Sequence, residues 1–381
     1  MKNVLLLFVF LCVACKSSPD KVEPSKSTAA LEELQLSVDA LFNDKIGENK
    51  PGASLLIAYD GEMLIGKGYG LRDLEQQMPM TQSTNVRMAS VSKQFTALAI
   101  LSLVDKGLLS LNDPISKFWP YPVFKDITVQ HLLNHTSGLA DYEEPYFLKD
   151  WDKTKVVENK DILEWLETNP APIFEVGTQW EYCNTAYLVL ALLVEKVSGE
   201  EFSAYAQENV FKKAGMDHTT FYNLAKPVEI SERAYCHDKD SLGNWQKIDG
   251  YFMNGVLGDG AVYTSVNDYF KYDNALRNQS IVSKEMHALI FKPSTMPLAE
   301  NSYDFDFLNN AEEKYGMGWF LTDEFALHTG SWNGTRTIVL KEFKRPLTIA
   351  IFLSFASSEI RNELIEATYA LVDDYLENPD Q

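Results

Sequence analysis

Two residues with complementary chemistry, Ser90 and Lys93, lie three positions apart in the first third of the chain. On a helix that spacing places both side chains on one face, so the lysine amine can reach the serine hydroxyl and take its proton. A hydroxyl activated by a neighbouring base is a nucleophile for acyl transfer. A second Ser-x-x-Lys pair, Ser18 and Lys21, stands beside Pro19 in a polar stretch with no helix to present it. The sequence therefore favours Ser90 as the nucleophile.

The residues that follow Ser90 predict a buried helix that presents it. From Phe95 to Val104 nearly every side chain is apolar, which is the pattern of a helix buried on all sides. Its first turn would open into a pocket, where the positive end of the helix dipole favours negative charge near the serine oxygen. The alternative is that Ser90 only caps the helix and Lys93 is solvated.

A second candidate group, Tyr182 and Asn184, immediately precedes a predicted helix at 185–197. A tyrosine near a cation can lose its proton below its usual pKa of about 10, and an amide can hold a substrate carbonyl. A similar triplet at 272–274 lies within an amphipathic helical run, where Tyr272 is more simply a packing residue.

A third group, His328-Thr329-Gly330-Ser331, lies in a predicted strand near the C-terminus. A glycine in a strand permits close approach of a ligand to the backbone. A backbone N–H just past Gly330 could join that of Ser90 to stabilise an oxyanion. Read alone, His328 is more simply a structural or surface histidine.

Both ends of the chain carry strands and an amphipathic helix, while the middle is mainly helical. An N-terminal helix is predicted around 31–42, followed by a hairpin whose strands, 53–59 and 62–69, are joined by Asp60-Gly61. A final helix is predicted at 359–376. The predicted C-terminal strands are Tyr315–Leu321, Ala326–Trp332, Arg336–Glu342 and Leu347–Ser354.

This order of elements predicts an α+β fold. Strands from both termini would form one antiparallel sheet covered by the terminal helices, with a helical subdomain inserted between them. We expect the α/β part at about 29–85 and 312–378 and the helical part at about 86–311. The Ser90 helix would lie at their junction, where pockets preferentially form.

Composition bounds the function. The 381 residues contain 45% hydrophobic side chains, enough for a large core, and carry a formal charge of −20, which argues against binding nucleic acid. No His, Asp or Glu cluster has metal-ligand spacing, and no cofactor is expected. The expected partner is a small-molecule or peptide substrate, and the sequence leaves the oligomeric state open.

The first residues predict export. Lys2 is followed by an apolar run too short to span a bilayer, which predicts a signal peptide at 1–14. Its end at Cys15 is similar to that of a bacterial lipoprotein, which implies a lipid-modified cysteine, a polar tether at 15–28 and a location in the cell envelope or periplasm. Membrane contact would then come only through this anchor. Cys12 stands where such signals usually have leucine, so secretion as a soluble protein is the alternative.

The three groups, in this order, resemble the serine β-lactamase and penicillin-binding protein superfamily, whose marks are Ser-x-x-Lys, Tyr-x-Asn and Lys/His-Thr/x-Gly. The likeness is greatest to the class C β-lactamase-like branch, which includes D-alanyl-D-alanine carboxypeptidases and carboxylesterases. The stretches His131–Leu139, Gly177-Thr178 and Tyr315–Trp319 also look like this branch.

The resemblance implies a transpeptidase-like fold and a role for each site residue. Ser90 would be the acylated nucleophile, Lys93 and Tyr182 would share the proton transfers, and Asn184 would contact the substrate. The strand residues His328, Thr329, Gly330 and Ser331 would line the other side of the pocket. His135 lies in what looks like a structural loop of the family and is left out of the site.

The resemblance implies a serine hydrolase that forms an acyl-enzyme on small esters or D-amino-acid peptides of cell-wall type. His328 stands where many β-lactamases have lysine, and a histidine near its usual pKa of about 6.5 is only partly charged at pH 7, so anionic β-lactams would be held weakly. One alternative is a class C-like β-lactamase. An alternative of another class is a catalytically inactive protein that binds peptidoglycan or β-lactams. We expect the remaining cysteines, Cys183 and Cys236, to be free thiols.

Overall fold

The computed structural model describes residues 28–143, 145–149, 151–168 and 171–378. The predicted signal peptide, Cys15, the Ser18–Lys21 pair and nearly all of the predicted tether lie outside the described residues. Across the described ranges, no helix is both long enough and apolar enough to cross a bilayer.

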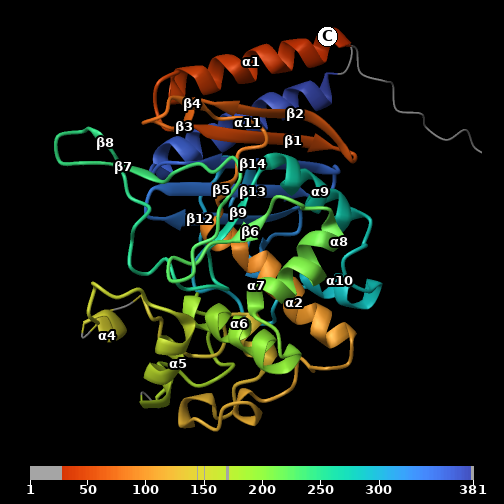
Figure 1. Cartoon of the computed structure of the whole chain (residues 1–381). Helices are drawn as coiled ribbons and strands as arrows, with labels where there is room; N and C mark the ends of the chain where they lie inside the picture. The colour runs from red at the N-terminus through yellow and green to blue at the C-terminus, as the bar shows by residue number, and fades with distance from the viewer. Residues whose placement is uncertain (1–27, 144, 150, 169–170, 379–381) are drawn as a thin grey trace, which may run out of the picture.

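A seven-stranded antiparallel sheet built from both ends of the chain forms the framework, as predicted (Figure 1). Strands β1 and β14 pair along their whole length, from Ala53 opposite Leu353 to Tyr59 opposite Leu347. In spatial order the strands are β10 (Lys314–Tyr315), β11 (Phe320–Leu321), β12 (Phe325–Trp332), β13 (Thr335–Glu342), β14 (Leu347–Leu353), β1 (Ala53–Tyr59) and β2 (Glu62–Tyr69).

One turn of this sheet agrees with the prediction, and a second turn was not predicted. Asp60 and Gly61 both have positive φ, 50° and 84°, which is the geometry of the tight hairpin expected between β1 and β2. The single strand predicted at 315–321 is wrong, because β10 and β11 are separated by a turn in which Gly318 has a φ of +80°. A Cβ on Gly318 would lie 2.8 Å from the Gln94 backbone nitrogen, so the turn packs directly on the Ser90 helix.

The two faces of the sheet bury different helices because successive side chains of a strand point in opposite directions. On one face, Ile338 and Leu340 pack with the terminal helices α1 (Thr28–Ile46) and α11 (Ser358–Glu377). Val339, between them, belongs to the other hydrophobic cluster, on the face that covers the helical part. The predicted arrangement of terminal helices over the sheet is therefore confirmed (Figure 1).

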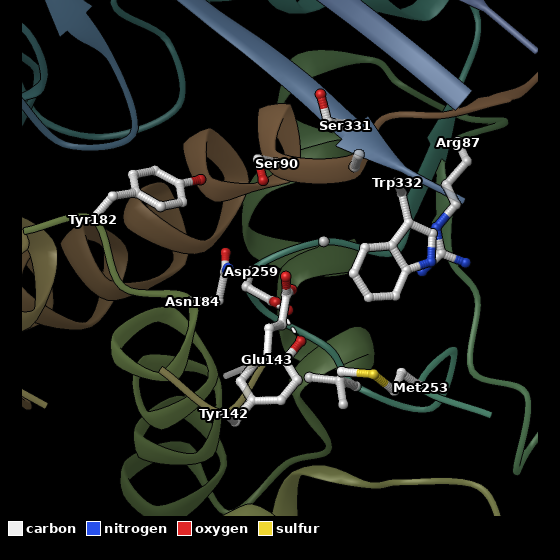
Figure 2. Close-up of a pocket in the computed structure, with 13 residues that line it drawn as sticks. Arg87, Ser90, Tyr142, Glu143, Tyr182, Asn184, Met253, Asp259, Ser331 and Trp332 are labelled. Atoms are coloured by element: carbon white, nitrogen blue, oxygen red, sulfur yellow. Dashed lines mark hydrogen bonds between the residues drawn. The ribbon is translucent and has the colours of Figure 1, made fainter. Parts of the chain in front are cut away.

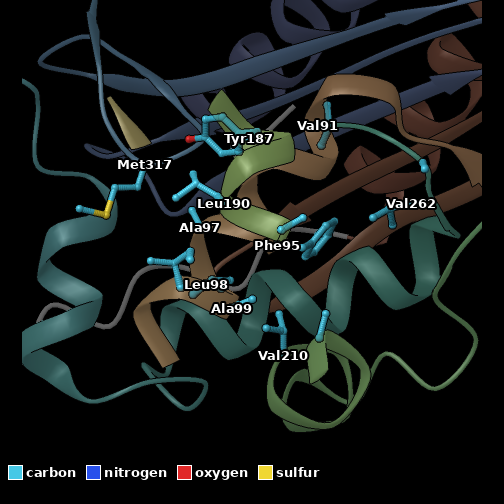
Figure 3. Close-up of a cluster of buried hydrophobic side chains, with 14 of the residues drawn as sticks. Val91, Phe95, Ala97, Leu98, Ala99, Tyr187, Leu190, Val210, Val262 and Met317 are labelled. Atoms are coloured by element: carbon cyan, nitrogen blue, oxygen red, sulfur yellow. The ribbon is translucent and has the colours of Figure 1, made fainter. Parts of the chain in front are cut away.

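Helix α2 (Lys93–Asp105) is the centre of the larger hydrophobic cluster (Figure 3). All its residues from Lys93 to Leu103 are buried, as its apolar sequence predicts. It packs against α6 (Asn184–Ser198) and the π-helical turn η4 (Gln207–Phe211). In α9 (Val266–Arg277), the Tyr272 ring lies 4.8 Å from that of Phe95, which confirms Tyr272 as a packing residue.

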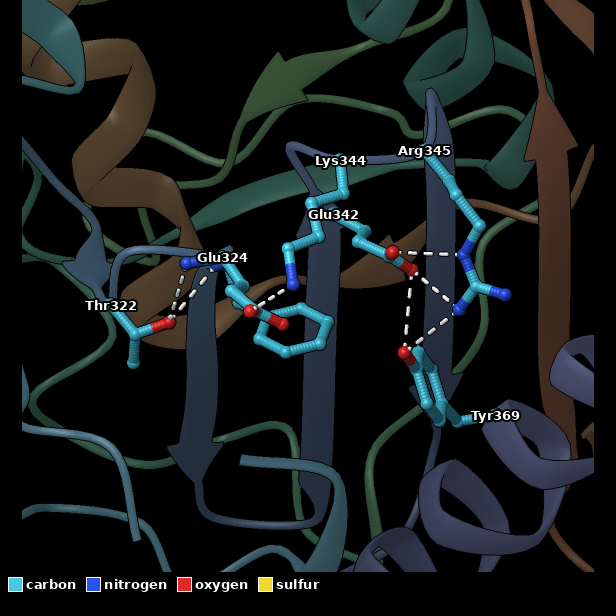
Figure 4. Close-up of polar contacts among 7 residues, drawn as sticks. Thr322, Glu324, Glu342, Lys344, Arg345 and Tyr369 are labelled. Carbon is cyan, nitrogen blue, oxygen red and sulfur yellow. Dashed lines mark hydrogen bonds and ion pairs between the residues drawn. The ribbon is translucent and has the colours of Figure 1, made fainter. Parts of the chain in front are cut away.

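Polar contacts fix the end of the sheet where the β13–β14 turn meets α11 (Figure 4). Arg345 donates two hydrogen bonds of 2.8 Å to the Glu342 carboxylate and a third, of 3.0 Å, to the Tyr369 hydroxyl of α11. Lys344 pairs with Glu324, which ties this turn to the turn between β11 and β12. The C-terminal strands and helix are thus held as one unit.

The remaining elements are short and connect this framework to the helical part. The helices are α3 (Val129–Leu133), α4 (Pro145–Leu148), α5 (Asn159–Thr168), α7 (Phe202–Ala206), α8 (Lys212–Ala214) and α10 (Lys284–Ile290), with 3-10 turns η1 (Ala89–Ser92), η2 (Ile115–Lys117), η3 (Pro122–Phe124) and η5 (Asp306–Leu308). The small sheets are β3 (Leu71–Asp73) with β4 (Met78–Pro79), β7 (His237–Lys239) with β8 (Trp245–Lys247), and β9 (Val262–Thr264) between β5 (Val86–Arg87) and β6 (Thr220–Phe221).

Candidate active site

Ser90 lies in the 3-10 turn η1, which leads directly into α2. Ala89 in this turn has a φ of +47°, a left-handed conformation that costs a non-glycine residue about 1–2 kcal/mol. Strand β9 supports the turn, because Met88 N donates to Val262 O over 2.8 Å and Val262 N donates to Ser92 Oγ over 3.1 Å. The serine side chain is left partly exposed at the N-terminal end of a buried helix.

Gly330 allows β12 to lie against residues 88–92, the turn that carries the candidate nucleophile and is called the nucleophile turn below. A Cβ at this position would lie 2.2 Å from Met88 O and 3.2 Å from Ala89 Cβ, so only a glycine permits the approach. Thr337 Oγ1 of the neighbouring strand donates to Met88 O over 2.9 Å. The prediction that this glycine gives a ligand access to the backbone is wrong, because the space is filled by the chain's own turn. The following residue, Ser331, does line the cavity beside Ser90.

Lys93 is fully buried, and its amine lies 3.3 Å from Ser90 Oγ. The same nitrogen lies 2.7 Å from Asn184 Oδ1 and 2.9 Å from Asp259 O, both of which can only accept hydrogen bonds. Burial lowers the pKa of Lys93, while the carboxylates of Asp259, Glu143 and Asp141 oppose that shift. The structure therefore places a desolvated amine within reach of the candidate nucleophile.

Tyr182 points its hydroxyl toward Ser90 (Figure 2). Its ring packs on His135, with centroids 4.5 Å apart, and lies 4.8 Å from the Lys93 amine. The hydroxyl makes no hydrogen bond of normal geometry with any described residue. The expectation of a lowered pKa is wrong, because burial raises the pKa of Tyr182 well above 10 despite the nearby lysine.

The start of α6 positions Asn184 at the cavity wall. Its backbone nitrogen donates to Asp141 Oδ2 over 2.5 Å, while Cys183 N donates to the buried His135 ring over 3.1 Å. His135 thus holds the Tyr182–Asn184 segment without lining the cavity, which agrees with the structural role expected for it. Cys183 and Cys236 are free, buried thiols, as predicted.

His328 does not contribute a charge to the cavity. It is 1% exposed, its Nδ1 lies 2.6 Å from Thr329 O, and burial next to Lys93 lowers its pKa to about 3. The expectation of a partly charged histidine on the pocket wall is therefore wrong. Thr329 bonds to the Tyr303 hydroxyl instead, and neither His328, Thr329 nor Gly330 lines the cavity.

The candidate site is a cavity of about 210 Å³ in front of Ser90 (Figure 2). It brings together Ser90, Tyr182, Asn184 and Ser331 of the predicted set, with Lys93 directly behind. The lining residues that sequence reasoning missed come from five separate segments, and they are Arg87, Ala89, Tyr142, Glu143, Met253, Val256, Asp259, Gly260 and Trp332.

The missed acidic wall is built around Asp259. Tyr142 donates a hydrogen bond of 2.7 Å to Asp259 Oδ2, and burial raises the pKa of Tyr142 well above 10. Burial of the carboxylate, with Asp259 and Asp141 nearby, also raises the pKa of Glu143, although the residue as a whole is exposed. No local motif marks these residues, because they come from loops at 141–143 and 259. Among the described residues, no group of three or more His, Cys, Asp or Glu side chains could hold a metal ion.

Comparison with known proteins agrees with this geometry. The model of the Beta-lactamase family matches residues 38–370. Penicillin-binding protein 4* of Bacillus subtilis (strain 168) is 31% identical over 333 residues, which are 83% of this chain and 71% of that protein.

Solved structures are similar over most of the chain. The octameric penicillin-binding protein homologue from Pyrococcus abyssi has a TM-score of 0.73 and 26% identity, over 93% of this chain and 78% of that one. A D-amino acid amidase from Ochrobactrum anthropi SV3, complexed with L-phenylalanine amide, has a TM-score of 0.71 over 91% of this chain and 98% of its own. At 22% identity this last likeness concerns the fold alone.

Proposed function

Because this chain belongs to the Beta-lactamase family, a family of serine hydrolases, we propose that it hydrolyses ester or amide bonds through a covalent acyl-enzyme on Ser90. The observation that carries the proposal is the 3.3 Å contact between Lys93 Nζ and Ser90 Oγ at the wall of a cavity. A buried amine beside a hydroxyl is the arrangement that activates a serine nucleophile.

Lys93 acts as the general base. Two of its N–H bonds are directed to Asn184 Oδ1 and Asp259 O, so in the neutral amine the lone pair faces Ser90 Oγ. The lowered pKa increases the fraction of neutral amine at a given pH. Lys93 takes the hydroxyl proton as Ser90 Oγ attacks the substrate carbonyl carbon.

Tyr182 acts as the proton donor to the leaving group. Its raised pKa keeps the phenol protonated, and its hydroxyl faces Ser90 without another partner. When the acyl–oxygen or acyl–nitrogen bond breaks, the phenol gives its proton to the departing atom and recovers one from Lys93. Water then attacks the serine ester by the reverse of these transfers, and the acid is released.

Two backbone N–H groups are proposed to stabilise the oxyanion, those of Ser90 and Ser331. The close packing of Gly330 on the nucleophile turn supports this assignment, since it brings the end of β12 beside Ser90. The N-terminal end of α2 adds a favourable dipole at the same position.

The proposed substrates are small esters and D-amino-acid peptides of cell-wall type. The likeness to penicillin-binding proteins supports this class. The strand side of the site supplies no fixed charge, because His328 is buried with a pKa of about 3. The test compares a short neutral ester, a D-alanyl-D-alanine peptide and a chromogenic cephalosporin, with wild type and Ser90→Ala. Turnover of the cephalosporin far above that of the other two would instead assign a class C-like β-lactamase.

A catalytically inactive binding protein is the alternative of another class. This alternative is disfavoured because the chain contains Ser90, Lys93 and Tyr182 close to one another, and an inactive relative needs none of the three. The discriminating experiment is an intact-mass spectrum after exposure to a fluorophosphonate, in which an inactive protein remains unmodified.

We further propose that the protein is exported and lipid-modified on Cys15. The support is the apolar run after Lys2 that ends at a cysteine. Expression in a bacterial host with and without Cys15→Ala, followed by separation of membranes from soluble protein, tests the anchor. Equal membrane association of both proteins would contradict it.

A further inference from the structure

Arg87 is a buried cation without a partner at the edge of the cavity. It is 4% exposed and lines the same cavity as Ser90. No described residue makes a hydrogen bond or ion pair with its guanidinium, and its Nε is wholly buried and unsatisfied. A buried charge is costly unless it is paired. The Arg87 guanidinium would therefore be stabilised by an anion, and no described residue supplies one.

The neighbours of Arg87 cannot supply that anion. Burial raises the pKa of Cys236 to about 12 and that of Tyr263 well above 10, so both are neutral. Asp249, whose carboxylate also acts on Cys236 and Tyr263, is paired with Arg233 over 3.1 Å. Arg87 therefore has no ion-pair partner among the described residues around it.

Trp332 covers one face of the guanidinium and makes no hydrogen bond to its edges. The Arg87 carbon Cζ lies 5.5 Å from the indole centroid, and the ring is fixed by a 2.8 Å hydrogen bond from its Nε1 to Asn254 Oδ1. Stacking of this kind uses the face of the guanidinium, whereas its N–H donors lie in the plane. The two side chains lie together on the side of the cavity opposite Tyr182 (Figure 2).

The backbone of Arg87 is held on both sides, which fixes its distance from the nucleophile. It belongs to β5, where it pairs with Tyr263 of β9. On the other side Thr335 Oγ1 donates to Arg87 O over 3.0 Å. Because Ser90 follows only three residues later, the cation and the nucleophile are parts of one rigid segment.

Of the described residues that line the cavity, Arg87 is the only arginine or lysine. Lys93 lies behind the wall with its amine directed to Ser90, Asn184 and Asp259. The opposite wall carries the Asp259 carboxylate, which disfavours a ligand with several negative charges. The site suits a single, planar, singly charged oxyanion next to the scissile bond.

We propose that Arg87 binds a carboxylate of the substrate through the donors at its edge, so that the preferred substrates are peptides or amides with a free carboxylate. This inference rests on the proposed function, since it names the substrates of the same site. A guanidinium matches a carboxylate with two parallel N–H···O bonds. Arg87 thus takes the place of the charge that was expected, and not found, at His328.

The test is equilibrium binding to the Ser90→Ala protein, which requires no acyl transfer. Isothermal titration compares N-acetyl-D-alanyl-D-alanine with its C-terminal amide, two ligands of equal size that differ by one charge. We expect the acid to bind about tenfold more tightly or better, as a charge-assisted pair requires. In Ser90→Ala/Arg87→Gln the two affinities should agree within about twofold, whereas Arg87→Lys should retain part of the difference.

Arg361→Gln in the same background is the matched control, because it removes another buried guanidinium, on α11, that does not line the cavity. It should keep the full preference for the acid. Equal affinities in Ser90→Ala, no measurable binding of either ligand, or a preference that survives Arg87→Gln would each overturn the inference. If thermal unfolding shows that the Arg87→Gln protein does not fold, the ratio of the acid and amide affinities is measured in Ser90→Ala/Arg87→Lys instead. A ratio equal to that of Ser90→Ala would contradict the inference. Failure of the proposed function would show separately, as no fluorophosphonate adduct on wild type.

Discussion

Lys93 Nζ lies 2.7 Å from Asn184 Oδ1, so a single hydrogen bond joins the Ser-x-x-Lys segment to the Tyr-x-Asn segment 91 residues later. Asn184 therefore has two roles. It faces the cavity, and it orients the Lys93 amine toward Ser90. The contact also explains why α2 and α6, which pack along each other in the core, must keep their relative register.

Replacement of Ser90 by alanine should abolish turnover and leave the fold intact. The Ser90 hydroxyl caps no helix, so its loss should cost at most about 1 kcal/mol of unfolding free energy. Intact-mass spectra should show one fluorophosphonate adduct on wild type and on Ser102→Ala, a serine of α2 whose hydroxyl contacts Tyr205 in the core. The Ser90→Ala protein should show none, and an adduct on it would place the nucleophile elsewhere.

Lys93 and Tyr182 should behave as one unit. Each single replacement, Lys93→Met or Tyr182→Phe, should lower kcat/KM for an ester by about 10² to 10⁴. The double variant should lose no more than about tenfold beyond the worse single variant, because both residues serve one chain of proton transfers. Steady-state kinetics of the four proteins measure this, and independent, multiplying losses would contradict the shared scheme.

The pH profile should separate the two roles. For a neutral ester, kcat/KM should rise with pH as Lys93 loses its proton, at a pKa below the usual 10.5 of lysine. No descending limb from Tyr182 should appear below about pH 10, because burial raises its pKa above that value. The rise should persist at a lower plateau in Tyr182→Phe. A profile that loses its rise in Tyr182→Phe but keeps it in Lys93→Met would reverse the assignment.

Gly330→Ala should impair activity through packing alone. The added methyl would lie 2.2 Å from both Met88 O and Thr337 Oγ1, which forces β12 away from the nucleophile turn. We expect a loss of about 2 kcal/mol or more in unfolding free energy together with a fall in kcat. Gly250→Ala is the control, since nothing lies within 4 Å of its added Cβ and it does not have a positive φ. Wild-type kinetics and stability in Gly330→Ala would show that the close approach is unimportant.

His328 should affect stability in acid. Its pKa is about 3 in the folded protein and about 6.5 when unfolded, so between these values the unfolded chain binds more protons. The unfolding free energy should therefore fall as pH drops below about 6.5, by up to about 1.4 kcal/mol per pH unit from this group, and be unaffected by it above that pH. Urea unfolding should show that the difference in unfolding free energy between wild type and His328→Gln is constant near neutral pH and shrinks toward about pH 4.5. A constant difference over the whole range would mean that His328 is not buried in its neutral form.

The sheet, its terminal helices and the buried helix could be predicted because each rests on a periodic or local signal. The alternation of β13 and the continuous apolar run of α2 depend only on neighbours in sequence. The turn at Gly318 was missed because its strands are two residues long, which is below the length at which alternation is visible.

The site was only partly predictable because burial, which decides the charge of each group, is a property of the folded chain. The pKa of Tyr182 was expected to be lowered by a nearby cation, and that of His328 to lie near its usual value. In the folded chain, desolvation determines the pKa of both residues. Arg87 carries no sequence signal at all, since a single arginine in a short strand is ordinary. Its significance comes from the absence of a partner among the described residues around it.

The pairing of β1 with β14 also bears on how the protein folds. Ala53 meets Leu353 across 300 residues of sequence, and Thr335 and Thr337 of β13 donate hydrogen bonds to the carbonyl oxygens of Arg87 and Met88, which lead into the Ser90 turn. Closing loops of this length is slow, and topologies dominated by such contacts fold slowly. A nascent chain that ends before β13 lacks the strands that hold Ser90 in place. The proposed nucleophile would therefore be held in its place only after the C-terminal strands have left the ribosome.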